Sequence, residues 1–105
     1  PSELIGSGLL PSAYNLEQSY PNPFNPSTTI KYQLPFDSKI SLKVFDLLGH
    51  EVATLVSDVQ LAGDKSIEWN AFGLASGVYF YKIEAINTAD PRKTFTLVKK
   101  MTLMK

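Results

Sequence analysis

Apolar residues recur at every second position through much of this chain. Residues 28–34 place Ile30, Tyr32 and Leu34 on one side and polar side chains on the other. This period of two is typical of a β-strand with one buried face, because successive side chains of a strand point to opposite faces. The chain is therefore expected to consist of strands that turn one face toward a common core.

Seven stretches carry this pattern, and proline, glycine or polar turn residues separate them. The expected strands are residues 14–20, 28–34, 39–46, 51–56, 65–70, 77–87 and 93–105. The stretch 77–87 gives the strongest signal, because it is dense in β-branched and aromatic residues. Residues 57–63 are expected to form a longer connection. Seven short antiparallel strands without a helix predict an all-β fold, an immunoglobulin-like β-sandwich.

A proline-rich joint separates the first two expected strands. It contains Pro21, Pro23 and Pro26. Proline donates no backbone hydrogen bond and fixes φ, so this segment cannot lie inside a sheet. We expect a rigid corner that crosses between two sheets and buries Tyr20 and Phe24. The alternative is a polyproline-type ligand in which these two aromatic side chains are exposed anchors.

The composition fits one globular domain without a strong electrostatic partner. The 105 residues, 44% of them hydrophobic and 19% charged, suffice for one core. Ten basic and ten acidic residues cancel, so no general attraction to nucleic acid or to anionic membrane is expected. Cysteine is absent, and no apolar run approaches the ~18 residues that would cross a bilayer. Residues 1–13 lack any period and are expected to be a linker or arm, with residues 14–105 as the domain.

No residue pattern indicates catalysis, a metal site or a cofactor. The only histidine, His50, stands beside Glu51 and is expected to be a solvated turn residue. One histidine cannot supply a zinc site. Asp46, Asp58 and Asp64 flank loops and could meet at one end of a sandwich, although capping of turns explains them more simply. Calcium binding by these carboxylates stays open, and we expect no enzymatic activity.

Four aromatic residues raise the possibility of a carbohydrate-binding surface. They are Trp69, Tyr79, Phe80 and Tyr81. Because strand alternation turns half of such side chains into the core, at most two of them are free for sugar rings. Trp69 is expected to be a core residue.

The last stretch combines lysine with apolar residues. Lys99, Lys100 and Lys105 surround Met101 and Leu103. One interpretation is an edge strand that lysine protects from aggregation. The other is an exposed address that a partner protein recognises by strand addition and charge.

Four segments together resemble the type A C-terminal sorting domain of type IX secretion cargo. They are residues 20–30 (YPNPFNPSTTI), 44–55 (VFDLLGHEVATL), 74–81 (LASGVYFY) and 99–105 (KKMTLMK). The resemblance implies a seven-stranded sandwich at the end of a larger secreted protein, with residues 1–13 as the arm from an upstream cargo domain. It also implies recognition by the outer-membrane translocon and removal by a sortase-like peptidase. The cargo would then be released or attached to surface lipopolysaccharide.

The resemblance also assigns roles to residues. Recognition by the translocon would involve Gly77, Tyr79, Lys99, Lys100, Met101, Leu103 and Lys105. Cleavage would fall in the arm, around Ser7, Gly8, Leu9 and Leu10. The chain would pass through the periplasm and then reach the medium or the cell surface, without inserting into a bilayer itself and without a nucleic-acid partner.

Two other classes of protein remain as alternatives. The proline joint and the strand after Gly77 also resemble the immunoglobulin-like domain of flagellar hook-capping proteins. Those domains carry a Trp-Asp-Gly segment, whereas this chain has Trp69, Asn70 and Ala71. This departure and the lysine-rich last stretch favour the sorting domain. A carbohydrate-binding module is the third class, and it would need an exposed aromatic platform.

Overall fold

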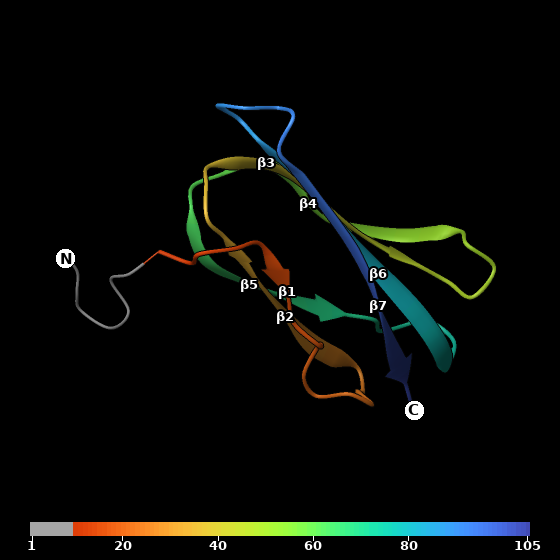
Figure 1. Cartoon of the computed structure of the whole chain (residues 1–105). Helices are drawn as coiled ribbons and strands as arrows, with labels where there is room; N and C mark the ends of the chain where they lie inside the picture. Colours follow the sequence, from red (N-terminus) through yellow and green to blue (C-terminus); the bar gives the residue numbers. More distant parts are fainter. Residues whose placement is uncertain (1–9) are drawn as a thin grey trace.

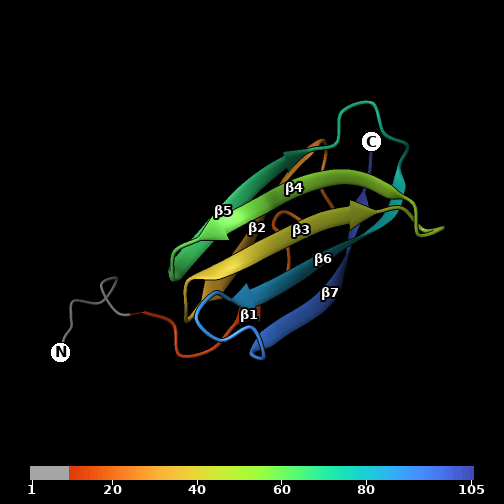
Figure 2. The same cartoon turned by 90° about the horizontal axis from the view of Figure 1, so that it is seen from above.

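The computed structural model describes residues 10–105, which form two sheets stacked face to face (Figure 1; turned view in Figure 2). The strands in this part of the chain are β1 (Asn15–Leu16), β2 (Ser27–Leu34), β3 (Ser38–Phe45), β4 (Glu51–Gln60), β5 (Gly63–Asn70), β6 (Gly77–Asn87) and β7 (Thr94–Leu103). One sheet has the order β1-β2-β5 and the other β4-β3-β6-β7, with all neighbours antiparallel. The predicted all-β, immunoglobulin-like sandwich is confirmed. Residues 10–105 include no helix long and apolar enough to cross a membrane.

The alternation in the sequence sets which face of each strand is buried. Burial alternates along β2, β3 and most of β6, with Ile30, Tyr32 and Leu34 on the inner face as predicted. The buried apolar residues are Leu16, Phe24, Ile30, Tyr32, Leu34, Ile40, Leu42, Val44, Val56, Trp69, Ala71, Tyr79, Tyr81, Ile83, Ala85, Met101 and Leu103. Each large side chain buried there contributes roughly 1.5–3 kcal/mol. This shared core holds the two sheets together.

Two strand predictions were wrong in length. The connection expected at residues 57–63 is mostly strand, because β4 continues to Gln60 and pairs its polar residues with β3, for example Ser57 with Ser41. Polar residues can occupy an edge strand, so a loss of alternation there did not mark its end. The first strand is only Asn15–Leu16, because the backbone from Glu17 to Ser19 turns toward Tyr81 of the other sheet. The chain stays beside β2, where Tyr20 forms an isolated antiparallel bridge with Thr29.

The proline joint is a corner, but it does not carry the chain from one sheet to the other. Both β1 and β2 belong to the three-stranded sheet. Between them, the corner reaches across to β7, where Phe24 forms a bridge with Leu103. Phe24 is buried as predicted, whereas Tyr20 is 80% exposed and the prediction that it is buried was wrong. The segment thus connects the two sheets at one edge.

Tyr81 of β6 makes the polar part of this connection. Its hydroxyl accepts a hydrogen bond from the Ser19 amide at 2.8 Å and donates one to the Glu17 carbonyl at 2.7 Å. Burial raises the pKa of this hydroxyl above its ordinary value, so the hydroxyl keeps the proton that it donates. One side chain therefore satisfies the amide of the buried Ser19 and the carbonyl of Glu17.

We predict that Tyr81→Phe lowers the free energy of unfolding by about 1–3 kcal/mol, because the Ser19 amide and Glu17 carbonyl lose their partner. Urea unfolding followed by the fluorescence of Trp69 measures this change. The matched control is Tyr20→Phe, which removes a hydroxyl from an exposed ring and should change the free energy by less than about 0.5 kcal/mol. Equal effects of the two substitutions would contradict the role of Tyr81.

Candidate recognition site

The described chain starts at one end of the sandwich and finishes at the other. Leu10 lies beside the turns that contain Phe36 and Thr88. The Lys105 amide instead donates a hydrogen bond of 3.2 Å to the Ser76 hydroxyl, just before β6. We call this second region, with the 46–50 turn, residues 71–81 and residues 99–105, the far end.

The structure brings the predicted recognition residues together at the far end. In the β6–β7 pairing, Gly77 lies opposite Leu103, Tyr79 opposite Met101, and Tyr81 opposite Lys99. Their exposure divides them into two groups. Tyr79, Met101 and Leu103 are buried, Gly77 and Lys99 are half-buried, and Lys100 and Lys105 are exposed. Only the lysines therefore present side chains that a partner could contact.

Tyr79 and Gly77 shape this end from within. The Tyr79 hydroxyl donates a hydrogen bond of 2.7 Å to the Ala75 carbonyl, and its ring meets Trp69 edge-on with centroids 5.9 Å apart. Gly77 has a φ of +151°, a conformation that residues with side chains disfavour, although no atom lies within 4 Å of the place that a Cβ would occupy. Gly77 and Tyr79 therefore fix the turn into β6, Gly77 through its backbone conformation and Tyr79 through its packing and hydrogen bond.

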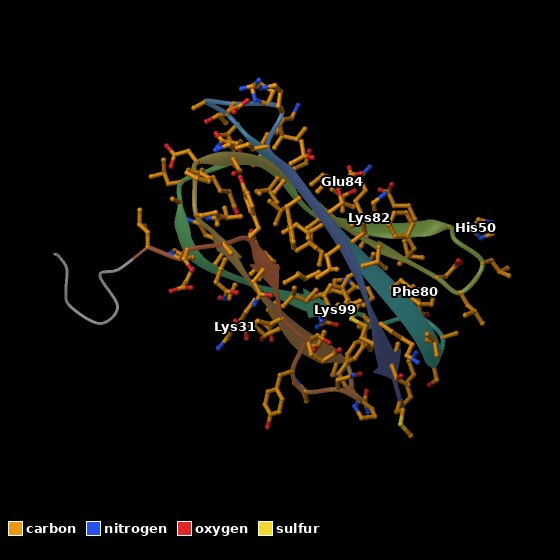
Figure 3. All side chains as sticks on the ribbon, in the orientation of Figure 1. Lys31, His50, Phe80, Lys82, Glu84 and Lys99 are labelled. Atoms are coloured by element: carbon orange, nitrogen blue, oxygen red, sulfur yellow. The ribbon has the colours of Figure 1, made fainter. Side chains whose placement is uncertain are left out.

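Lys99 lies on the side of β7 that faces the other sheet, whereas Phe80 and Lys82 lie on the outer side of β6 (Figure 3). A charged side chain that points inward on an edge strand discourages pairing with another strand. Lys99 thus fits the protective interpretation of the lysines as well as the recognition interpretation.

The proline corner covers the outer edge of β7 at the far end. The Thr102 amide donates to the Asn22 side-chain oxygen at 2.9 Å, and the Thr102 carbonyl accepts from the Phe24 amide at 3.0 Å. The Met104 amide donates to the Phe24 carbonyl at 3.0 Å. Further along, the Gln18 side-chain amide donates to the Lys100 carbonyl at 2.8 Å. Four outward backbone groups of residues 100–104 are therefore already paired.

The turn between β3 and β4 contributes apolar side chains that the sequence did not single out. Leu47 is 69% and Leu48 80% exposed. Asp46 orders this turn, because its carboxylate accepts hydrogen bonds from the amides of His50 and Leu48 at 2.8 and 3.0 Å. These bonds, that from His50 above all, lower the pKa of the Asp46 carboxyl. A surface hollow of about 300 Å³ separates this turn from Gly77.

The other polar candidates do not converge. His50 is exposed in its turn as predicted, with its imidazole 3.3 Å from Asp46 rather than paired with Glu51. Asp58 accepts the Val59 amide, and Asp64 stands in β5. Within residues 10–105, no three histidine, cysteine or acidic side chains gather as a metal site would require.

The aromatic platform is not formed. Trp69, Tyr79 and Tyr81 are buried, and Phe80 is half-buried on the outer face of β6 (Figure 3). Trp69 is a core residue as predicted. One partly exposed ring gives no stacking surface of the kind that a carbohydrate-binding module needs.

The fold and this site define a small β-sandwich whose last strand is fastened by a proline corner. Residues 18–98 match the model of a family described as a secretion system C-terminal sorting domain. The chain belongs to this family, because the match covers well over half of its length. Searches of curated proteins and of solved structures returned no match.

Membership gives the function of the domain. It is the C-terminal sorting signal of a cargo protein of the type IX secretion system, and that cargo is secreted or displayed at the cell surface. Sorting domains are normally not catalytic. The match ends at Val98, so the roles of Lys99 to Lys105 are not tested by it. The relation to hook-capping domains stays a prediction.

We predict that Asn22→Ala frees the Thr102 amide from its cover. Loss of one hydrogen bond of about 0.5–1.5 kcal/mol should speed hydrogen exchange at Thr102 roughly 2- to 13-fold. Exchange measured by NMR residue by residue checks this prediction. Asn25→Ala is the control, because Asn25 is exposed in the same corner and makes no hydrogen bond to β7. Unchanged exchange at Thr102 in Asn22→Ala would show that the corner does not protect this edge.

Proposed function

We propose that the outer-membrane translocon of the type IX system recognises the far end of the sandwich. In this proposal Gly77, Tyr79, Met101 and Leu103 hold the last two strands in shape. Lys99, Lys100 and Lys105 supply the charged contacts. The observation that supports this division is burial: Tyr79, Met101 and Leu103 face the core, whereas Lys100 and Lys105 are exposed.

The opposite positions of Leu10 and Lys105 favour this arrangement. A cargo domain joined through residues 1–13 would be held beside the Phe36 turn, while the lysines would stay accessible at the far end. In this proposal residues 14–105 are the sorting domain. Tyr14 supports that boundary, because its ring stacks on Phe95 at 5.5 Å and its hydroxyl shares a 2.7 Å hydrogen bond with Ser38.

The second part of the proposal concerns removal of the domain. A sortase-like peptidase would cut in the arm at Ser7 to Leu10 after passage from the periplasm through the outer membrane. Ser7, Gly8 and Leu9 lie outside the described residues. The support comes from Leu10, which is 63% exposed, because a peptidase needs access to the bond that it cuts. The cargo is then released or attached to the cell surface.

We predict that Lys100→Ala with Lys105→Ala reduces export several-fold without unfolding the domain, because both side chains are exposed. Residues 1–105 are joined to a reporter in a host with a working type IX system, and the reporter is measured in cells and medium. The control is Lys31→Ala with Lys39→Ala, which removes two exposed lysines elsewhere. Equal export of the two double variants, with equal urea midpoints, would sink the assignment of the lysines.

We also predict the position of the cut. Mass spectrometry of the exported reporter should give a product that ends within residues 7–10. A product that retains Tyr14 would contradict the proposed cleavage region, because Tyr14 already packs on the sandwich. In a host that lacks the sortase-like peptidase, the fusion should stay uncut.

A further inference from the structure

The first half of β7 has an edge that the proline corner does not cover. In an antiparallel pair, residues alternate between exchanging hydrogen bonds with the partner strand and pointing these groups away from it. The backbone groups of Thr102 and Lys100 point away from β6. This follows from their partners, since the proline corner binds the Thr102 amide and carbonyl and Gln18 binds the Lys100 carbonyl. The β6–β7 register is unbroken, so Val98, Thr96 and Thr94 also point their amides and carbonyls outward.

No other part of residues 10–105 pairs with these outward groups. The backbone bonds nearest to them are those of Lys93, which belong to the β6–β7 turn. Thr94, Thr96 and Val98 are also exposed, with Val98 at 50%. We call residues 94–98 the open edge. Unpaired donors and acceptors in a row form a template for one more strand.

The other sheet edges carry the features that prevent strand addition. Two register shifts interrupt the β3–β4 pairing, and the Asp58 carboxylate of β4 accepts a hydrogen bond from the Val59 amide. The β5 edge carries the charged residues Asp64, Lys65 and Glu68, and β1 has only two residues. The open edge has no charge, proline or bulge, and its residues favour the strand conformation.

Charge at its two ends indicates what kind of strand fits. Arg92 and Lys93 precede the open edge, and Lys99 and Lys100 follow it. A second copy paired antiparallel about Thr96 would set Lys93 against Lys99 and Arg92 against Lys100, and directly opposed like charges destabilise a strand pair. A strand with an uncharged centre and acidic ends would instead meet a cation at each end.

We propose that the open edge is a strand-addition site for an extended protein segment with β-branched residues at its centre and acidic residues at both ends. The added strand would extend the four-stranded sheet next to β7. Backbone hydrogen bonds would supply affinity, and the flanking cations would select the segment. This inference goes beyond the sorting function and does not depend on which residues the translocon recognises.

The test uses the full chain and a peptide probe of the sequence Glu-Asp-Thr-Val-Thr-Val-Thr-Asp-Glu. Binding is followed by NMR amide shifts and calorimetry. The expected result is saturable binding with the largest shifts at Thr94, Thr96 and Val98, and weaker binding as salt is added. A matched peptide with lysine in place of each acidic residue should bind at least tenfold more weakly.

Two variants at position 96 separate the contribution of the backbone amide to binding from that of the side chain. Thr96→Pro removes an outward amide without removing a bond to β6 and should raise Kd about tenfold or more, equal to ~1.4 kcal/mol. Thr96→Val keeps that amide and should bind as the natural chain does.

Lys93→Gln with Lys100→Gln tests the flanking charges. This double variant should weaken binding and flatten its salt dependence, with the fold checked by the amide spectrum.

Four results with the peptides would overturn the proposal. They are no binding of the acidic peptide, shifts centred on another edge, equal binding of the lysine peptide, and full binding by a folded Thr96→Pro variant. Concentration-dependent shifts at residues 94–98 without peptide would assign the edge to a second copy and overturn it as well. None of these results bears on export of the reporter, so the sorting function is judged separately.

Discussion

The hydroxyl of Tyr81 joins segments that the sheets alone do not connect. It lies at the centre of β6 in the four-stranded sheet and binds the backbone at Glu17 and Ser19, which follows a strand of the other sheet. The chain then runs directly into the proline corner. The position of Phe24 against β7 therefore depends on where Tyr81 holds the preceding backbone, together with the Tyr20–Thr29 backbone pair that follows. Apolar burial supplies most of the stabilisation, and this polar contact fixes how the covering segment lies over the core.

Periodicity predicted the inner faces well because burial acts on every second residue. Ile30, Leu42 and Ile83 lie where alternation puts them. Alternation failed as a guide where another constraint decides. Tyr20 is a large aromatic residue of the kind that cores contain, but it lies at the start of the proline corner. The prolines restrict where the chain can turn there, and Phe24 occupies the buried position instead. The end of β4 is polar because it is an edge, so its residues from Ser57 to Gln60 looked like a loop.

The sequence indicated residues that the structure gathers at one end of the sandwich. Their role in recognition stays a prediction, because sequence motifs do not separate folding from recognition. Gly77 and Tyr79 stand out in the sequence, and the structure gives each a mechanical reason, a positive φ and a hydrogen bond to Ala75. Lysines near an apolar strand indicated an edge, and β7 is one. The cover over that edge could not be predicted, because it joins Asn22 to Thr102 across 80 residues of sequence. No local pattern encodes such a contact.

The hydrogen bonds from Asn22, Phe24 and Gln18 decide how a partner can contact the lysine-bearing half of β7. Strand addition there would displace Asn22, Phe24 and Gln18 from four hydrogen bonds, which costs about 2–6 kcal/mol at 0.5–1.5 kcal/mol each. Exposing the buried Phe24 side chain would cost roughly 1.5–3 kcal/mol more. A partner that contacts Lys100 and Lys105 from outside meets neither cost. The same strand therefore offers two different surfaces, side-chain charge at the far end and unpaired backbone at residues 94–98, because the proline corner covers only one of its halves.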